Sequence, residues 1–281
     1  MRHKILLILG IAPFFMSIKS YAIPLKTAQE ADFNIEKDLL LVQFDCKTDV
    51  DDLHTVAALV TLMSNSKFSK VQYHAVTGTY GNQKGLYVPP NDLFQLSFGN
   101  NWTDAHKNFN YAVEKVKNIV LKTLQNEGDL WIAEAGQSDF TAELIKAIQI
   151  NLPKMKVSKH IHVVQHSDWN ETHTSTENLK FVQKYADYKK IPDGNKIGNG
   201  TPGFRDPTYS YWKNKIRTPD LVNIWQLATD LSKKYNGKKG RYNNKAISNG
   251  GLDFSDLSEV CWILGIQNIK DIEQFFTFSL L

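Results

Sequence analysis

Apolar and polar positions follow two periods along the chain, one typical of buried strands and one typical of helices. Short runs at residues 39–44, 71–79, 130–133 and 160–165 predict strands, and the apolar run at 39–44 suits a buried one. Helical spacing of apolar residues is found at residues 53–63, 102–126, 139–150 and 177–185. Thr103 or Asp104 is the expected N-cap of the second helix, and Ser138 or Asp139 that of the third. Strands that alternate with helices predict an α/β fold with an open, mostly parallel sheet covered by helices on both faces.

The pattern changes at residues 189–217, which are rich in Gly, Pro, Asn and Lys and which we expect to form a long loop. Loops that carry aromatic residues on a rigid α/β scaffold often face a ligand, so this segment is expected to border the binding site. The alternative is that its rings pack on the helix predicted at residues 220–235. The aromatic residues concerned are Phe204, Tyr209, Tyr211 and Trp212. A second polar loop is expected at residues 236–249, followed by an apolar, mostly helical end from Asp256.

Residues 1–22 have the pattern of a signal peptide. Arg2 and Lys4 precede an apolar run at residues 5–16, and Ser20 and Ala22 offer small residues for cleavage. The run is too short to span a bilayer, although an uncleaved membrane anchor is the alternative. We therefore expect one exported domain, residues 23–281, periplasmic or secreted, without stable membrane insertion after removal of the signal.

Composition narrows the class of protein. With 281 residues, 42% of them hydrophobic and 22% charged, the chain can bury a sizeable core and is not a disordered polypeptide. The net charge is +4, but residues 1–22 hold three basic residues and no acid, so the remainder is close to neutral. This balance gives no reason to expect a nucleic-acid partner. Cys46 and Cys261 are the only cysteines, and they are either two buried thiols or a disulfide, which export would permit.

Four carboxylates follow the first predicted strand within eight residues: Asp45, Asp49, Asp51 and Asp52. Open α/β sheets bind ligands at the carboxyl ends of their strands. Several carboxylates in one crevice repel each other unless a cation compensates, and Ca²⁺ binds through several oxygen ligands. One or two of these carboxylates could instead stabilise a helix N-terminus by interacting with the helix dipole, but this does not account for all four.

This acidic segment resembles the N-terminal fingerprint of the inosine–uridine-preferring nucleoside hydrolases, one branch of which carries Asp-x-Gly-Thr-Asp-Val-Asp-Asp. The resemblance implies that Asp45 is a general base and a Ca²⁺ ligand, that Asp52 is the principal Ca²⁺ ligand and that Asp51 holds ribose hydroxyls. Lys47 replaces a glycine of the pattern, and Gln43 stands where the family usually has a further Asp. In a competing register, Asp45 aligns with that further Asp of the family, and Lys47 then occupies the position of the general base. We prefer the first register because residues 48–52 then match without a gap.

Weaker matches follow in the family's order over residues 38–265. They imply a substrate contact from Asn82, a backbone carbonyl ligand for Ca²⁺ from Glu134, sugar contacts from Asp168 and Asn170, and a last Ca²⁺ ligand from Asp256. Each has a plainer interpretation: Asn82 as a turn residue, and Asp168, Asn170 and Asp256 as helix caps. His162 is expected to be a packed strand residue and His166 to point into the crevice. A zinc site is disfavoured because no third His or Cys has suitable spacing.

The resemblance implies Ca²⁺-dependent hydrolysis of the N-glycosidic bond of a nucleoside or related glycoside. Many relatives activate the leaving group with a His immediately before the last Asp, but here Ser255 occupies that position. Together with Lys47 and Gln43, Ser255 favours the rival hypothesis of a non-catalytic nucleoside- or carbohydrate-binding protein. A metal-dependent phosphoester hydrolase is a third hypothesis, but the sequence has no Gly-rich phosphate loop. The expected partner is a small molecule, and a homo-oligomer is left open.

Overall fold

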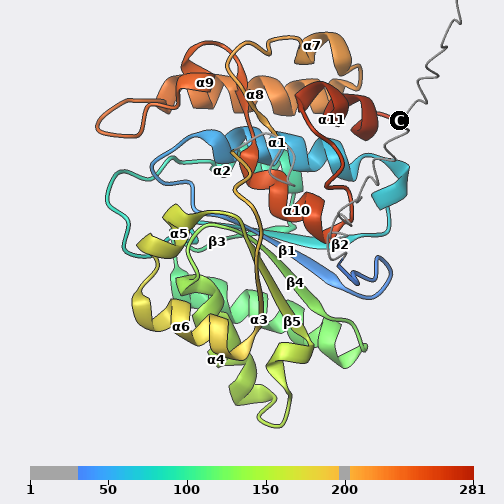
Figure 1. The fold of residues 1–281 in the computed structure, drawn as a ribbon, viewed down its shortest axis with the longest axis vertical. Helices are drawn as coiled ribbons and strands as arrows, with labels where there is room; N and C mark the ends of the chain where they lie inside the picture. The colour runs from blue at the N-terminus through green and yellow to red at the C-terminus, as the bar shows by residue number, and fades with distance from the viewer. Residues whose placement is uncertain (1–30, 196–202) are drawn as a thin grey trace, which may run out of the picture.

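Six parallel strands form the centre of the molecule in a computed structural model that describes residues 31–195 and 203–281 (Figure 1). The expected signal peptide lies outside the described residues. In spatial order the strands are β3 (Trp102–Asp104), β2 (Gln72–Thr77), β1 (Leu39–Phe44), β4 (Leu130–Ala135), β5 (Ile161–Gln165) and β6 (Asp187–Lys190). All neighbouring pairs are parallel. The predicted α/β class with an open parallel sheet is therefore confirmed.

Strand order reverses beside β1, which pairs with β2 on one side and β4 on the other. The chain runs outward through β2 and β3, then returns to continue through β4, β5 and β6. Such a reversal separates the connections that leave the carboxyl ends of the two central strands and creates a crevice there. The acidic segment after β1 lies at this point of the sheet.

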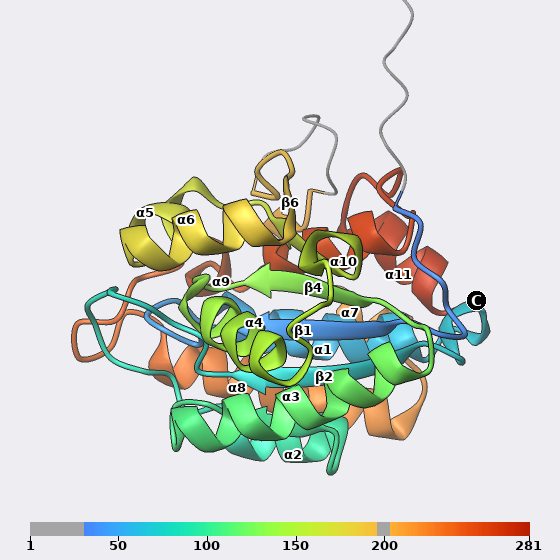
Figure 2. The same cartoon turned by 90° about the horizontal axis from the view of Figure 1, so that it is seen from below.

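Helices cover both faces of the sheet because the central strands are apolar on both sides (Figure 2). Leu39 and Leu41 face a core with α3 (Phe109–Gln125), α4 (Asp139–Asn151) and α6 (Thr176–Tyr185). Leu40 and Val42 face the opposite core, which is formed with α1 (Asp51–Met63), α2 (Asn91–Phe98) and the C-terminal helices. Successive strand residues point to opposite faces, so one run supplies both cores.

The helix predicted over residues 102–126 begins later than expected. Residues 102–104 form β3 instead, pairing with β2 at the edge of the sheet. Thr103 hydrogen-bonds to the ring of His74 on β2, over 2.8 Å, which ties the short strand in place. The helix α3 starts after Asn108, whose side chain accepts a hydrogen bond from the Tyr111 N–H. Neither Thr103 nor Asp104 is thus the N-cap that we expected.

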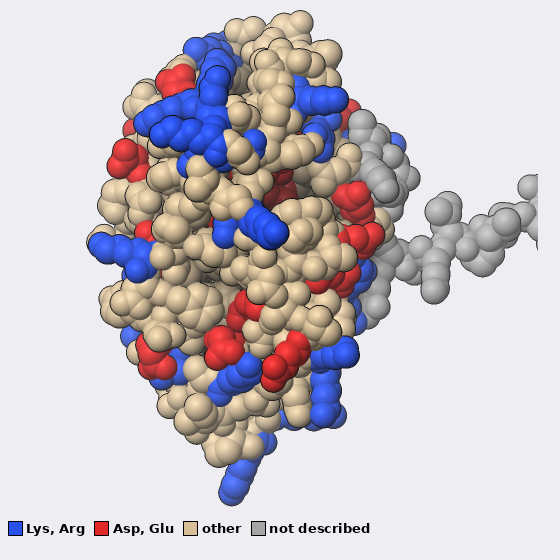
Figure 3. All heavy atoms as spheres, turned by 90° about the vertical axis from the view of Figure 1, so that its left-hand side faces the viewer, with Lys and Arg blue, Asp and Glu red and all other residues tan. Residues whose placement is uncertain are grey.

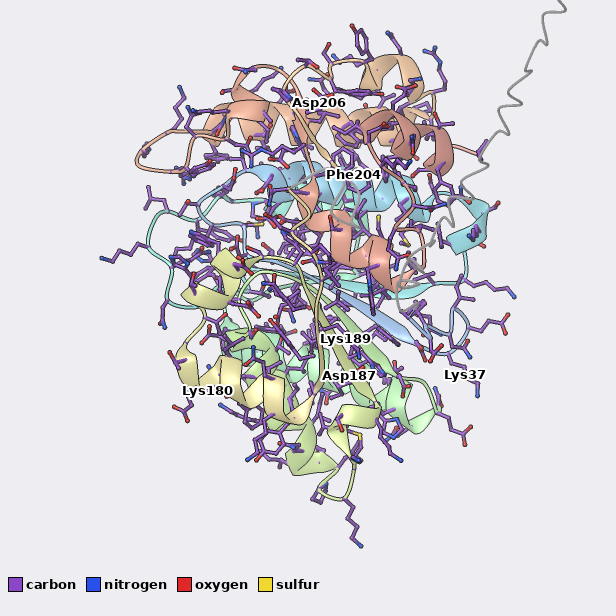
Figure 4. All side chains as sticks on the ribbon, viewed as in Figure 1. Lys37, Lys180, Asp187, Lys189, Phe204 and Asp206 are labelled. Carbon is purple, nitrogen blue, oxygen red and sulfur yellow. The ribbon has the colours of Figure 1, made fainter. Side chains whose placement is uncertain are left out.

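The long segment after residue 189 also differs from the expected loop. Its beginning belongs to β6, where Lys189 lies beside Asp187, whereas Phe204 and Asp206 lie beside the C-terminal helices (Figure 4). Residues 205–206 form β7, antiparallel to β8 (Leu252–Asp253), and a short helix, α7, spans Trp212–Lys215. Edge strands and single helical turns are too short to produce a clear sequence period.

The C-terminal part forms a further helical layer. The predicted helix at residues 220–235 is confirmed as α8 (Pro219–Tyr235), which packs on α1, and α9 (Lys245–Ser248) follows within the expected polar loop. The predicted helical end consists of η3 (Ser255–Leu257), α10 (Ser258–Ile263) and α11 (Ile272–Ser279). The remaining short elements are η1 (Ser66–Phe68), η2 (Val157–Lys159) and α5 (Asp168–His173). Among the described helices, none has the length and apolar character needed to cross a membrane.

Candidate metal and ligand site

A cavity of about 330 Å³ opens at the carboxyl edge of the sheet, beside the reversal of strand order. Its lining comes from the segment after β1, the end of β4, the residues that lead from β5 into α5, and η3, together with Asn195, Arg205 and Tyr242 from later parts of the chain. Five of the eight residues to which the resemblance gives a role line it, namely Asp45, Asp51, Asp52, Asn170 and Asp256. A more open hollow of about 930 Å³ lies near α2 and α3. Among the described residues no metal-binding group of side chains lies there, so the smaller cavity is the candidate site.

Three carboxylates converge in this cavity. One oxygen each from Asp51, Asp52 and Asp256 lies within 4.8 Å of the others. Asp51 and Asp52 begin α1, whereas Asp256 arrives from η3, which packs against α1. Burial raises the pKa values of all three carboxyls well above their usual range, and repulsion between the carboxylates adds to the rise.

The donor set fits a hard divalent cation. Asp52 is almost fully buried, and its Oδ2 accepts a hydrogen bond from the Cys46 N–H over 2.9 Å. Its other oxygen, Oδ1, is buried and has no hydrogen-bond donor among the described residues. An unpartnered buried carboxylate oxygen is costly, and a cation would satisfy it. Ca²⁺ binds oxygen at 2.3–2.6 Å. Two oxygens on one such ion are at most about 5 Å apart, a limit that the cluster meets.

Asp45 lies beside this cluster but is held by other contacts. Its Oδ1 accepts the Lys47 N–H over 2.9 Å, and its Oδ2 accepts the side-chain amides of Gln83 and Gln137 over 2.8 and 3.0 Å. Burial raises the pKa of Asp45, although these three hydrogen bonds and the neighbouring Asp52 oppose the rise. A carboxylate offers about four acceptor sites. One acceptor site on Asp45 thus remains for a water or a ligand.

Lys47 lines the cavity but does not occupy the position of a cation. Its Nζ lies 4.0 Å from the centre of the Tyr80 ring, an arrangement that stabilises the ammonium through cation–π attraction. It forms no ion pair within 4 Å with any described carboxylate. The three converging carboxylates are therefore not neutralised by this lysine.

The fourth acid of the N-terminal cluster, Asp49, belongs to a second buried network. The Asn244 side-chain amide lies 3.2 Å from Asp49 Oδ1 and 2.8 Å from Asp253 Oδ2, and the Arg205 guanidinium lies 3.2 Å from Asp253. Burial and the charge of Asp253 raise the pKa of Asp49 to about 7. Ser255 donates to Asp253 over 2.9 Å and is fully buried. Its hydroxyl is thus committed to this network.

Three residues singled out from the sequence do not line the cavity. The backbone carbonyl of Glu134 accepts a hydrogen bond from Gln165 over 2.8 Å, and the next residue, Ala135, is the one at the cavity wall. Asn82 is exposed. The side chain of Asp168 is 95% exposed and lies 2.8 Å from Lys190 Nζ.

The side chain of Glu134 forms part of a polar cluster beneath the site. It accepts hydrogen bonds from Ser138 and Thr141 over 2.7 and 2.6 Å. Gln43 donates to Thr141 over 2.9 Å. Burial raises the pKa of Glu134 to about 7 despite these donors. Gln43 thus supports the wall of β4 and contributes no charge to the cavity.

His166 points into the cavity as expected, and its environment is acidic. Its Nδ1 lies 2.8 Å from Glu259 and its Nε2 lies 3.8 Å from Asp256. Burial acts to lower the pKa of His166, but the charge and hydrogen bonding of Glu259 and the charge of Asp256 raise it to about 9. His162 is a packed strand residue, as expected, and stacks on Trp131 with 4.0 Å between ring centres.

Several residues at the site were not predicted from the sequence. Gln83 and Gln137 hold Asp45, and Arg205, Trp169 and Tyr242 line the cavity. A weak signal existed for the glutamines, since each directly follows a Gly or Asn in the turn after a buried strand. Trp169 and Tyr242 are about half exposed.

Comparison of the chain with protein-family models, with curated proteins and with solved structures finds no match.

Proposed function

We propose that the protein hydrolyses the N-glycosidic bond of nucleosides or related glycosides with the help of a divalent cation, Ca²⁺ in the first instance. The observation that carries this proposal is the convergence of Asp51, Asp52 and Asp256 beside Asp45 in one cavity at the carboxyl edge of the sheet. The resemblance of the acidic segment to the nucleoside hydrolase fingerprint supports the same reaction.

Asp51, Asp52 and Asp256 are the residues that would hold the cation. When bound, it would lower the pKa of a nearby water and offer positive charge to the hydroxyls of a sugar. This differs from the ligand set implied by the sequence, because Asp51 takes the place of Asp45 and of the Glu134 carbonyl.

Asp45 is the proposed general base. Burial makes its carboxylate more basic than an exposed one, and its remaining acceptor site can take the proton of an attacking water. Gln83 and Gln137 fix the carboxylate plane through their hydrogen bonds, so the acceptor site keeps one direction. Asn170, which accepts from Gln137 over 3.1 Å, continues this row of amides toward the sugar.

The leaving group has a binding surface, but Ser255, at the position of the histidine in many nucleoside hydrolases, supplies no acid for it. Ser255 is buried in hydrogen bonds to Asp253 and cannot protonate a departing base. Trp169 and Tyr242 offer half-exposed rings at the cavity, on which a flat leaving group can stack. The reaction would therefore depend on leaving groups that depart readily, and a nitrophenyl riboside is the most sensitive substrate to test.

A second candidate, a non-catalytic binder of nucleosides or sugars, is favoured by one specific observation. Three donors already hold Asp45, which weakens its ability to accept a proton. The same cavity and cation would then retain a ligand without cleaving it.

One experiment separates the two candidates. The chain from residue 23 is incubated with Ca²⁺ and either a nitrophenyl riboside or a panel of nucleosides, and binding is measured by calorimetry in parallel. We expect hydrolysis that falls by roughly 10²–10⁴-fold in Asp45→Asn, the usual contribution of a general base. Asp92→Asn, an exposed carboxylate on α2, is the matched control and should retain full activity.

Hydrolysis that is unchanged in Asp45→Asn would contradict the role of Asp45. Binding without hydrolysis in the unsubstituted protein would establish the second candidate. Neither binding nor hydrolysis across the panel would contradict both.

A further inference from the structure

A strongly basic loop adjoins the candidate site. Residues 233–245 contain five lysines and one arginine and no acidic residue, in a chain that is otherwise nearly balanced in charge. Lys233, Lys234, Lys238, Lys239 and Lys245 are all exposed. None of them forms an ion pair with a described acidic residue. The positive charge of the loop is therefore available to a ligand.

The loop has a fixed conformation, so its charges keep a defined place. The Asn236 side chain donates to the Asn244 carbonyl over 2.9 Å and accepts from the Asn244 N–H over 2.8 Å, and these two bonds close the base of the loop. Arg241 donates to the carbonyl of Tyr87 over 2.6 Å and lies 5.0 Å from the Tyr235 ring, which anchors the tip. These contacts occupy the arginine, whereas the lysines form no ion pair with a described residue and only Lys234 lies over a ring, that of Tyr235.

The same loop reaches into the site. Tyr242 lines the cavity, and Asn244 donates to Asp49, another residue of the cavity wall. On this face, basic side chains gather above a recess in which acidic side chains are visible (Figure 3). Within the cavity, Lys47 adds a further ammonium without an ion pair to a described residue.

The cavity carries buried carboxylates, whereas the adjoining loop carries lysines. A ligand that contacts both regions therefore has a preferred orientation. The buried carboxylates repel an anionic group, and a cation held by them would attract the diol of a sugar. The basic loop attracts an anion. A molecule that satisfies both regions has a neutral, hydroxyl-rich end and a negatively charged end. Phosphate esters of nucleosides have this pattern.

We propose that the natural ligand is a phosphorylated nucleoside or glycoside, whose sugar enters the acidic cavity while its phosphate lies on the lysines of residues 233–245. The inference rests on the proposed function, because it takes the cavity as the sugar site. A phosphorylated small molecule is favoured over a nucleic acid or a membrane surface because Tyr242 connects the basic loop to the cavity, so that one ligand spans both.

The test compares matched ligands on the Asp45→Asn protein, in which turnover is suppressed. Calorimetry with Ca²⁺ present measures the affinity for inosine, inosine 5′-monophosphate and inosine 5′-diphosphate at low and at high salt. We expect the diphosphate to bind at least tenfold more tightly than inosine at low salt, with the advantage shrinking as salt screens the lysines.

Variants in which two lysines are replaced by glutamate test whether the loop causes the tighter binding of the diphosphate. Lys238→Glu/Lys239→Glu should abolish the advantage of the diphosphate while leaving the affinity for inosine unchanged. Lys154→Glu/Lys156→Glu makes the same change in net charge between α4 and β5, at the amino end of the strands, and should preserve the advantage. This control separates the loop from a general effect of charge.

Equal affinities for inosine and its diphosphate, or an advantage that survives Lys238→Glu/Lys239→Glu, would overturn this inference and leave the proposed function standing. Salt-sensitive binding of DNA or of anionic vesicles that the loop variant loses, with nucleotide affinities unchanged, would also overturn it by assigning the loop to a macromolecular surface. Binding of none of the three small ligands would contradict the proposed function, and this inference with it.

Discussion

At the scale of single residues, the dominant feature is a set of buried carboxylates whose repulsion the chain relieves only in part, through His166 beside Asp256. Asp51, Asp52 and Asp256 meet in one cavity, and one oxygen of Asp52 has no hydrogen-bond donor among the described residues. Function explains this cost better than stability does, since buried charges usually persist only when paired or bound to metal.

The first prediction follows from that cost. Ca²⁺ should raise the melting temperature of the protein and a chelator should lower it, because a cation bound only by the folded state adds about 2.7 kcal/mol at a hundred times its dissociation constant. Asp256→Asn should melt higher than the parent without metal, since it removes one repelling charge, and should lose the response to Ca²⁺. A melting temperature of the parent protein that is indifferent to divalent cations would refute the cluster as a metal site.

A second residue-scale prediction concerns acid stability away from the site. Burial lowers the pKa of His74 to about 4, from about 6.5 for the free side chain, and its ring is hydrogen-bonded to Asn101 and Thr103. The unfolded chain therefore takes up a proton first. Stability is complete above pH 6.5 and is lost as the pH falls towards 4. The loss is roughly 3 kcal/mol, at about 1.4 kcal/mol per pKa unit.

Urea unfolding at a series of pH values tests this assignment. The stability difference between the parent and His74→Gln should shrink by roughly 3 kcal/mol from pH 7 to pH 4, because the variant lacks the titrating group. His160→Gln, a substitution of an exposed histidine, is the control. A difference that stays constant over this range would show that His74 does not carry the acid sensitivity.

Site residues could be predicted where their charge marks them out. They could not be predicted where the conformation of a turn decides which side chain faces the cavity. A dense run of carboxylates after a buried strand identified Asp51 and Asp52, because so many charges have few structural uses. In the turns, however, the sequence pointed to Asn82 while the structure brings the adjacent Gln83 to Asp45. A turn decides which of two neighbouring side chains faces inward, and its dihedral angles are not encoded by polarity.

At the scale of elements, long periodic segments were predictable and short edge elements were not. The central strand β1 is buried on both faces, so its composition alone marks it as a strand of a parallel sheet. The edge strands β3 and β6 contain polar residues and become strands only through pairing with β2 and β5. Their existence depends on partners distant in sequence, which a local pattern cannot reveal.

In the segment at residues 189–217, the aromatic and the polar residues lie in different places. We expected its aromatic rings at the ligand site, but Phe204, Tyr209 and Trp212 are buried among the C-terminal helices, as the alternative held. Trp212 stacks on Trp225 of α8 with 5.9 Å between ring centres. The polar residue Arg205 of the same segment does line the cavity. The rings therefore anchor a segment whose polar residues reach the site.

A prediction at this scale is that Trp212→Ala destabilises the protein by about 3–5 kcal/mol, the usual cost of removing a buried tryptophan. Ligand affinity of the remaining folded protein should not change, because the ring is not at the cavity. Tyr211→Ala is the matched control, since Tyr211 is 60% exposed and should cost little. Weakened ligand binding in Trp212→Ala without a loss of stability would restore the original expectation for this ring.

At the scale of the whole molecule, the site joins parts of the chain that are far apart in sequence. Asp51 and Asp52 come from the first helix, whereas Asp256 and the basic loop come from the C-terminal layer. The two parts are linked through α1 and α8, where His54 hydrogen-bonds to Ser232 over 3.0 Å and Trp225 donates to Thr61 over 2.9 Å. The complete site therefore forms only when the first helix and the C-terminal layer have packed together.

The reactivity of the two cysteines can test whether the first helix and the C-terminal layer open together. Both are free thiols and fully buried, Cys46 directly after β1 and Cys261 in α10, and both belong to the same hydrophobic core. Burial raises the pKa of each thiol, so the reactive thiolate is suppressed in the folded protein. Because one core contains both, we expect them to become reactive together and only when that core opens.

A thiol reagent should therefore modify neither cysteine under native conditions, and a reductant should leave the melting temperature unchanged. In increasing urea, both should react with the same midpoint as the loss of helical circular dichroism, and Cys261→Ala would report on Cys46 alone. Fast labelling of Cys46 in native buffer, with Cys261 still protected, would show that the segment carrying the acidic cluster opens independently of the core. Addition of Ca²⁺ should then slow that labelling if the cluster holds the ion.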